Sequence, residues 1–257
     1  MKAAAIWQSR WTSGTRAEVL HALQRGALRW DSELEGQLLL GHAARVRRNT
    51  RILKYLLETG AAVDAIVNGL GQTAMHVAAN VPRNVVNIRY LAHQHARVDA
   101  TDADGRTPLV NAVLSRSPEN VSELLAFHAS PNIETIEGET PLSFCVAWSI
   151  RNSAALLCQA NANVNHRVAG DTPLIVQAAC NDDLKTLRLL LAHGADCDAT
   201  SGRSGLTALM IAIIERRLPI ARVLWNASDR SLKDNVGLSA EDYAAAANLE
   251  KSITASS

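Results

Sequence analysis

The sequence predicts an all-α solenoid, in which short helix-turn-helix units stack side by side along the chain. Two observations predict this fold class. A glycine followed by a helix-start motif recurs every 32 to 35 residues, and a leucine-rich segment followed by a helix stop recurs at the same distance. Because one short helix pair cannot bury its own apolar face, units repeated at this distance must stack on their neighbours.

The first recurring motif marks the start of each unit. Gly71, Gly105, Gly138, Gly170 and Gly205 each stand two residues before a threonine. In three units this threonine opens a Thr-Pro-Leu triplet. Threonine can cap free backbone donors, and proline fits the first helical position, where its missing N–H group is not needed. Each glycine therefore predicts a turn that leads into the first helix of a unit.

The second recurring motif marks the end of each unit's second helix. Segments such as 184–191 place leucines at three- and four-residue spacing, as one face of a helix requires. Each segment ends at a residue type that tolerates positive φ. These predicted helix stops are Gly26, Gly60, His95, His128, Asn161, Gly194 and Asn226. An extended finger loop, such as 195–200, is then expected to lead to the next glycine turn.

These motifs resemble the ankyrin repeat family. The resemblance is carried by Gly-Arg-Thr-Pro-Leu at 105–109, Gly-Glu-Thr-Pro-Leu at 138–142, Gly-Asp-Thr-Pro-Leu at 170–174 and Leu-Leu-Leu-Ala-His-Gly-Ala-Asp at 189–196. The segment 73–79 is similarly close to the family's Thr-Pro-Leu-His-x-Ala-Ala. The resemblance implies an ankyrin repeat solenoid with a concave binding face, and it implies that His76 forms a hydrogen bond between adjacent loops.

The period divides the chain into three parts. Residues 1–35 are expected to form an N-terminal partial or capping repeat, where Trp7 and Trp11 share one helix face. This tryptophan pair is interpreted as an apolar plug, with an exposed partner site as the alternative. Residues 237–257 are expected to form a C-terminal capping helix and a frayed tail. Between them, six ankyrin repeats are expected at 36–70, 71–104, 105–137, 138–169, 170–204 and 205–236.

Composition limits the function classes. The 257 residues include 26 Lys+Arg and 25 Asp+Glu, and a net charge of +1 argues against attraction of the whole molecule to nucleic acid. No segment approaches the ~18 apolar residues of a membrane span. The four cysteines have the spacing of neither a zinc site nor a disulfide scaffold. We expect an intracellular protein of the cytoplasm or nucleus, with secretion into a host as a pathogen effector as the alternative.

Charge is unevenly distributed along the chain. Residues 1–54 hold ten Lys/Arg against four Asp/Glu, whereas residues 55–140 hold five against ten. A compact basic cluster at a predicted helix-helix turn consists of Arg45, Arg47, Arg48, Arg51 and Lys54. We interpret this cluster as a solvated helix end. A nucleic-acid or phospholipid site is the alternative, but no aromatic residues are interleaved with the basic ones.

No motif indicates catalysis or metal binding. His93 and His95 are two residues apart, so they do not share one helix face as a metal-binding pair would. The sequence contains neither a nucleophile elbow nor a phosphate-binding loop. The four cysteines, Cys145, Cys158, Cys180 and Cys197, fall in predicted helices or fingers and are interpreted as small core residues. We therefore expect a protein that is not an enzyme and that uses no cofactor or metal ion.

Partner binding is expected on the concave face, where finger tips and first helices leave side chains free of packing. In the ankyrin repeat family, residues that flank the turn glycine and residues late in the first helix usually contact the partner. Carried over by position, the candidate partner-binding residues are Gln72, Asn80, Val81, Asp104, Arg106, Leu114, Ser115, Glu137, Glu139, Trp148, Asp171, Arg203 and Ile214. Trp148 is the expected hot spot, because an exposed indole combines a large apolar area with one N–H donor. The alternative is that Trp148 covers the core.

This set places an apolar middle beside an acidic finger edge formed by Asp102, Asp104, Glu134, Glu137 and Glu139. A basic, amphipathic peptide would complement both features. The expected function is that of a monomeric, non-catalytic protein-protein interaction module: an adaptor, inhibitor or targeting scaffold that binds a partner protein or peptide. The alternative is a small-molecule or lipid binder, or an enzyme, that uses an apolar groove around Trp148.

Overall fold

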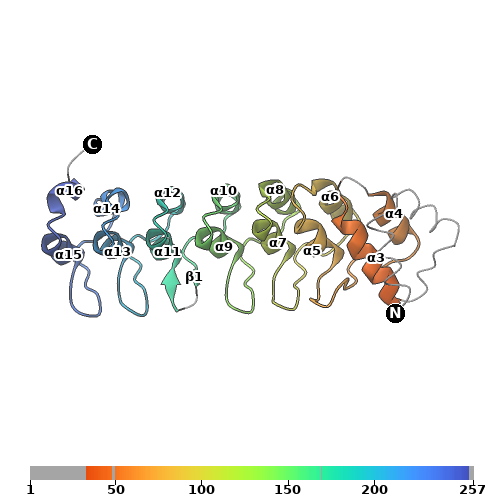
Figure 1. Cartoon of the computed structure of the whole chain (residues 1–257), viewed down its shortest axis with the longest axis horizontal. Coiled ribbons are helices and arrows are strands. Elements are labelled where there is room, and N and C mark those ends of the chain that lie inside the picture. The colour runs from red at the N-terminus through yellow and green to blue at the C-terminus, as the bar shows by residue number, and fades with distance from the viewer. Residues whose placement is uncertain (1–32, 48–49, 169, 255–257) are drawn as a thin grey trace.

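A computed structural model describes residues 33–47, 50–168 and 170–254. In these residues, seven helix pairs follow one another along an elongated array, and long finger loops project from one side of it (Figure 1). The predicted all-α solenoid is therefore confirmed. Trp7, Trp11 and the predicted helix stop Gly26 lie outside the described residues, as do Arg48 of the basic cluster and Ala169 of one finger.

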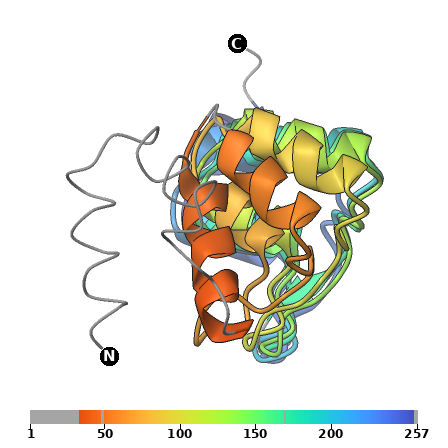
Figure 2. The ribbon, with the colours of Figure 1, turned by 90° about the vertical axis from the view of Figure 1, so that its right-hand side faces the viewer.

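The two helices of each pair form two parallel rows (Figure 1), and the units lie behind one another when viewed along the array (Figure 2). The first helices are α3 (Glu33–Arg45), α5 (Ala74–Ala79), α7 (Pro108–Leu114), α9 (Pro141–Ala147), α11 (Leu174–Cys180), α13 (Ala208–Ile214) and α15 (Ala240–Ala246). The second helices are α4 (Arg51–Glu58), α6 (Val85–His93), α8 (Pro118–Ala126), α10 (Arg151–Gln159), α12 (Leu184–Ala192), α14 (Leu218–Trp225) and α16 (Glu250–Thr254).

Threonine side chains begin most of the first helices, as the sequence predicts. The Oγ1 atom of Thr107 accepts a hydrogen bond from the N–H group of Val110 at 3.4 Å, and Pro108 occupies the first position of α7. Threonine caps of the same kind begin α9 and α13. Each cap satisfies one backbone donor that the helix itself cannot pair.

The unit that contains Thr172 departs from this pattern. Thr172 and Pro173 form the short strand β2 (Thr172–Pro173), which pairs in antiparallel fashion with β1 (Arg167–Val168) across the finger. Because these two residues extend the finger hairpin, α11 begins only at Leu174 and Pro173 takes the N-cap position. The prediction that Thr-Pro-Leu opens the helix is therefore wrong in this one unit.

Of the six predicted helix stops that fall within the described residues, five are confirmed. Positive φ is found at Gly60, His95, His128, Asn161 and Gly194. At Asn226 the prediction is wrong, because φ is −93° and the residue remains in the right-handed region. The N–H groups of Ala227 and Ser228 both donate to the carbonyl oxygen of Leu224 at 2.9 Å. The last turn of α14 thus tightens without a left-handed residue.

A continuous apolar core lies between the two rows of helices. Each second helix from α4 to α14 contributes one fully buried leucine at the same position, namely Leu56, Leu91, Leu124, Leu157, Leu190 and Leu224. Small residues of the first helices, such as Ala78, Ala112 and Ala178, are also fully buried and let neighbouring helices approach closely. The extensive contacts join helices of one unit or of consecutive units, so the core is built from neighbour to neighbour.

The C-terminal unit is a helix pair, where the sequence predicted a single capping helix. The guanidinium of Arg222 in α14 donates two hydrogen bonds to the carbonyl oxygen of Ser252, at 2.8 and 3.0 Å, and so holds α16 against the array. Residues 252–254 therefore belong to α16 and not to a frayed tail, while 255–257 lie outside the described residues. None of the described helices is long and apolar enough to cross a lipid bilayer.

Candidate partner-binding surface

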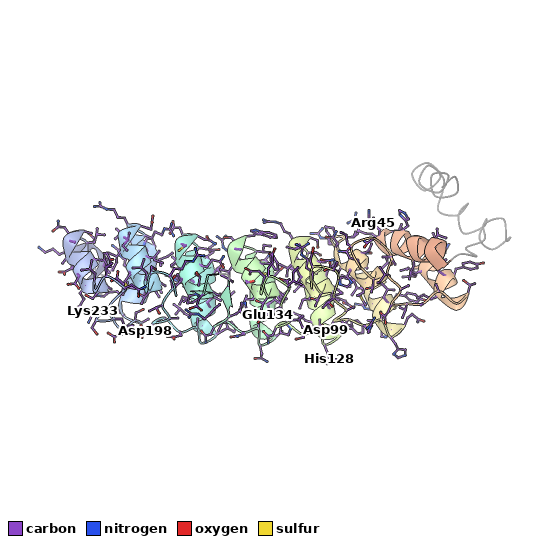
Figure 3. The ribbon with its side chains drawn as sticks, turned by 90° about the horizontal axis from the view of Figure 1, so that it is seen from below. Arg45, Asp99, His128, Glu134, Asp198 and Lys233 are labelled. Atoms are coloured by element: carbon purple, nitrogen blue, oxygen red, sulfur yellow. The ribbon has the colours of Figure 1, made fainter. Side chains whose placement is uncertain are left out.

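The fingers are joined to one another at their bases by a row of side-chain hydrogen bonds. An Asp or Asn carboxylate or amide oxygen of one finger accepts from a backbone N–H group of the next finger at 2.7–3.0 Å. The acceptor–donor pairs are Asp64–Arg97, Asp99–Ser130, Asn132–Asn163, Asn165–Asp196 and Asp198–Asp229. Figure 3 shows two of the acceptors, Asp99 and Asp198, along the same side of the array. This ladder, here called the finger-base ladder, sets the spacing between fingers.

The finger tips are joined by backbone hydrogen bonds. The N–H group of Ala103 donates to the carbonyl oxygen of Leu70 at 2.9 Å, and that of Ile136 donates to Asp104 at 3.0 Å. Towards the C-terminus, Gly202 donates to Asp171 at 3.0 Å and Asn235 donates to Ser204 at 3.1 Å. The tips are therefore held in register, so their outward side chains form a defined surface and not a set of independent loops.

His76 forms the inter-loop hydrogen bond that the resemblance implied. Its Nδ1 atom accepts from the N–H group of Thr73 at 3.2 Å, so the proton lies on Nε2, which donates to the carbonyl oxygen of Arg106 at 2.9 Å. Burial lowers the pKa of His76, because a charged ring would lose its hydration. His76 is thus a neutral structural link between one unit and the next finger.

Trp148 combines both roles considered for it from the sequence. The residue caps the C-terminus of α9, and its ring lies 5.6 Å from that of Phe144, centroid to centroid, at a tilt of 50°. It thereby covers a half-buried Phe144, yet 48% of its own surface remains exposed. Ile214, the last residue of α13, is 45% exposed, whereas Leu114 and Val81 are half-buried. The apolar part of the surface is therefore concentrated at Trp148 and Ile214.

The finger tips add further exposed apolar side chains. Ile136, next to the predicted contact residue Glu137, is 74% exposed. Leu70, which directly precedes the turn glycine of an earlier finger, is also exposed. Val236, beside Gly237 in the last finger, is 75% exposed. Sequence reasoning missed Val236, although Val236 flanks a turn glycine and so holds a position at which partner contacts were expected.

Four of the predicted polar contact residues are engaged within the array. Gln72 donates from Nε2 to the Oδ2 atom of Asp102 at 3.1 Å. Asp102 is buried and accepts from the N–H groups of Asp104 and Arg106, so its predicted place on an exposed acidic edge is wrong. Asp104 is exposed but forms an ion pair with Arg106 at 3.1 Å. Ser115 donates within the helices, to the carbonyl oxygen of Ala112 at 3.0 Å.

Asp171 and Arg203 lie at two neighbouring finger tips. The guanidinium of Arg167 forms an ion pair with Asp171, and hydrogen bonding from that arginine lowers the pKa of the Asp171 carboxyl. Arg167 also donates to the carbonyl oxygen of Thr200 at 2.6 Å, which ties the two fingers together. Arg203 is exposed, with its Nε atom 3.3 Å from the place of a Cβ atom on Gly170.

Three carboxylates of the predicted acidic edge lie on one finger, residues 128–140. Glu137 is exposed and Glu139 is half-buried, and among the described residues neither carboxylate has an ion-pair partner. Glu134 is exposed on the same finger, 3.7 Å from the Nδ1 atom of His166 (Figure 3). Asn80, at the end of α5, is also exposed. The predicted acidic edge is thus narrower than expected and is centred on this finger.

Asp196, Cys197 and Asp198 are the one group in the described residues whose side-chain donor atoms lie close enough together for a metal ion, within 4.8 Å of one another. Turn hydrogen bonds account for their arrangement. The Oδ1 atom of Asp196 accepts from the N–H group of Asp198 at 3.0 Å, and the Cys197 thiol donates to the carbonyl oxygen of Ala227 at 2.8 Å. Burial raises the pKa of the Cys197 thiol, which opposes the thiolate form that a metal would need.

Sequence reasoning also missed a second polar ladder, at the turns between the two helices of a unit. The Nδ2 group of Asn120 donates to the carbonyl oxygens of Ala79 and Val81 in the preceding unit, at 3.0 and 2.7 Å. Asn87 makes the same contacts one unit earlier, with Ala44 at 3.0 Å and with Val46 at 2.8 Å. The sequence held a signal for this ladder, because Asn87 and Asn120 lie one period apart.

Comparison with known proteins agrees with this architecture. A family model described as ankyrin repeats (3 copies) matches residues 85–168 and 155–234, and another described as ankyrin repeats (many copies) matches residues 42–80. Transient receptor potential cation channel subfamily A member 1 from Homo sapiens is 32% identical over 187 residues, which cover 70% of this chain and 16% of that protein. The B-cell lymphoma 3 protein homolog from Mus musculus is 31% identical over 204 residues, 75% of this chain and 45% of that protein. The chain thus spans less than half the length of either relative.

Solved structures show the same likeness. The ankyrin repeat domain of Bcl-3 superimposes with a TM-score of 0.69 at 25% identity and covers 84% of this chain and 95% of that domain. The human ASB11 ankyrin repeat domain superimposes with a TM-score of 0.64 at 25% identity, covering 79% of this chain and 90% of that domain. With the recurring caps, finger ladders and family-model matches along most of its length, the chain belongs to the ankyrin repeat family.

Proposed function

We propose that the chain is a monomeric, non-catalytic interaction module that binds a partner protein or peptide. The binding surface consists of the first helices and the fingers, the face that the resemblance predicts to be concave. One observation carries the proposal: large apolar side chains are exposed where the fold does not need them, with Trp148 at 48% and Ile136 at 74%. Exposed apolar side chains grouped on one face are typical of interaction sites.

The partner is proposed to be basic and amphipathic. On the 128–140 finger, Ile136 stands beside Glu137 with Glu134 and Glu139 close in sequence, so one exposed apolar group is flanked by three carboxylates. A segment that alternates Lys or Arg with apolar residues complements this arrangement in both charge and hydrophobicity. Trp148 is proposed as the hot spot, with a contribution of about 2 kcal/mol to binding.

A reducing, intracellular compartment is proposed for this interaction. All four cysteines, Cys145, Cys158, Cys180 and Cys197, are free thiols. Cys145 and Cys158 are buried, and burial raises the pKa of the Cys158 thiol to about 11, so it stays protonated and inert. Free, unpaired cysteines are typical of proteins of the cytoplasm and nucleus.

The test is affinity capture from an extract of the source cells, followed by titration of the captured partner. The surface variant carries Trp148→Ala with Glu137→Lys and Glu139→Lys. The matched control carries Val86→Ala and Glu250→Lys, which remove an exposed apolar group and an exposed carboxylate from second helices. Thermal unfolding of both variants should match that of the wild type.

A partner held by the wild type and the control is expected to bind the surface variant at least about 30-fold more weakly, which corresponds to 2 kcal/mol. If the surface variant captures the same proteins with the same affinity, the first helices and fingers are not the working face.

A further inference from the structure

The turns between the two helices of a unit lie at the opposite end of the helices from the fingers, because the helices of each pair are antiparallel. Each of the last six turns in the described residues contains one non-glycine residue with a φ of 52–57°. These residues are Arg83, Arg116, Ser149, Asp182, Arg216 and Asn248. An arginine in this left-handed region is strained relative to glycine or asparagine. Three of the six turns nevertheless carry arginine.

The fold gains little from these arginines. In the described residues, the side chains of Arg116 and Arg216 have no hydrogen-bond or ion-pair partner, and both are exposed. Arg83 pairs with Glu119 at 3.0 Å, but both side chains are largely exposed, and exposed ion pairs contribute little to stability. The backbone N–H group of Arg83 donates to the Oγ atom of Ser117 at 3.0 Å, whereas the side chains of Arg116 and Arg216 add no contact within the described residues that offsets the strain.

Two of the three arginines, Arg83 and Arg116, lie in the two turns that directly follow a turn with two further exposed arginines. The turn between α3 and α4 contributes those two arginines. Arg45 is the last residue of α3 and Arg47 lies in the turn itself, and both are exposed. Figure 3 shows Arg45 on the edge opposite the finger residues Asp99 and Glu134. Arg45, Arg47, Arg83 and Arg116 thus come from three consecutive turns, and they are here called the turn-edge patch.

The chemistry of the turn-edge patch selects its ligand. All four cations are guanidinium groups, which bind carboxylates with two parallel hydrogen bonds, and no lysine takes part. The patch spans only three turns of a chain whose net charge is +1, which suits a short acidic segment better than a long polyanion such as duplex DNA.

We propose that the turn-edge patch is a second docking surface, which binds an acidic polypeptide segment through bidentate arginine–carboxylate contacts. This second surface goes beyond the proposed function. It lies on the edge of the array away from the fingers, and its partner is acidic, whereas the partner of the proposed function is basic. All six turns share the left-handed conformation, so the distinguishing feature of this surface is that arginine occupies the strained position in two consecutive turns, after a turn that carries Arg45 and Arg47.

The test measures fluorescence anisotropy of labelled poly-L-glutamate titrated with the full chain. Arg83→Gly with Arg116→Gly is expected to weaken binding at least about tenfold while raising the melting temperature, since glycine adopts positive φ without strain. Ser149→Gly with Asp182→Gly is the matched control. It relieves the same backbone strain in the next two turns, and it is expected to raise the melting temperature without weakening binding.

Three results would overturn the proposal: no saturable binding of poly-L-glutamate by the wild type, unchanged binding by the double arginine variant, or an equal loss in the control. Tighter, Arg83- and Arg116-dependent binding of duplex DNA or of phosphatidylserine vesicles would overturn the assignment to an acidic polypeptide. The Trp148→Ala, Glu137→Lys, Glu139→Lys variant is expected to bind poly-L-glutamate at least as tightly as the wild type, which separates this surface from that of the proposed function.

Discussion

Asn120 links two neighbouring units, and its replacement by alanine tests how much of the array's stability lies between units. The side chain is fully buried. Its Nδ2 group donates to the carbonyl oxygens of Ala79 at 3.0 Å and Val81 at 2.7 Å, and its Oδ1 atom accepts from the N–H group of Asn84 at 2.9 Å. One residue thus joins the end of α5 and the start of α6 to α8.

The size of the effect follows from what alanine leaves unpaired. The carbonyl oxygen of Ala79 keeps a hydrogen bond from the Oγ atom of Ser115 at 3.2 Å. The buried N–H group of Asn84 and the carbonyl oxygen of Val81 keep no side-chain partner among the described residues. A buried polar group left unpaired costs about 1–3 kcal/mol, so Asn120→Ala is expected to lower the free energy of unfolding by about 2–4 kcal/mol.

Urea unfolding followed by circular dichroism measures this loss, and Ser153→Ala is the matched control. Ser153 occupies the equivalent position one unit later and is equally buried, but its Oγ atom has no hydrogen-bond partner among the residues that the structure describes. Because that hydroxyl is already unpaired, its removal is expected to leave the free energy of unfolding unchanged or to raise it, and not to lower it. A loss below about 1 kcal/mol for Asn120→Ala, or an equal loss for Ser153→Ala, would refute the reasoning.

Three further predictions concern single features of the array. Gly105→Ala should destabilise the chain more than Gly194→Ala: both residues have positive φ, but a Cβ atom on Gly105 would lie 2.8 Å from a neighbouring backbone nitrogen, whereas one on Gly194 would meet nothing within 4 Å. Urea unfolding ranks the two variants, and equal losses would contradict the prediction. Stability should fall as the pH drops below 6.5, because burial lowers the pKa of His76 and the unfolded chain therefore binds the proton first. His76→Gln should flatten this dependence, measured as melting temperature against pH, and an unchanged slope would argue against it. Amide hydrogen exchange should be faster in α3 and α4 than in α7 and α9, since the side chain of Thr50 does not cap α4; slower exchange in α3 and α4 would be inconsistent with this account.

The repeated features could be predicted because each depends on the conformational preference of a few adjacent residues. Thr107, in an extended conformation and followed by proline, begins α7. His95 and His128 end helices because their side chains tolerate positive φ. Such local preferences recur with the period, so the sequence alone identifies helix pairs and fingers.

The failures arise where contacts between units override local preference. Thr172 joins a strand because the finger hairpin extends to it, with Arg167 bonded both to Asp171 and to the following finger. Asp102 resembles an exposed acidic residue in sequence, yet it turns inward to accept three hydrogen bonds. The direction of a side chain in a finger is set by the neighbouring finger, which a single unit's sequence does not contain.

Contacts between units also explain why some predicted binding residues are free and others are engaged within the array. Trp148 and Ile214 are exposed because they end first helices, a position that the period alone identifies. Gln72, in contrast, is held between Asn68 and Asp102, and this engagement depends on the adjacent unit. Position in the repeat therefore predicts which residues reach the surface better than it predicts which of them are free to bind.

The finger-base ladder has a consequence for how the chain tolerates changes in length. Its acceptors from Asp99 to Asp198 recur every 33 residues, and each accepts from the N–H group 31 residues further on. Deletion of a whole period, such as 105–137, would bring Asp99 opposite Asn163 with the same register. Deletion of half a period, such as 105–120, would instead bring Val146, inside α9, opposite Asp99 and would break the ladder. Insertions and deletions in whole units therefore lengthen or shorten the array without disturbing the hydrogen bonds of the remaining fingers.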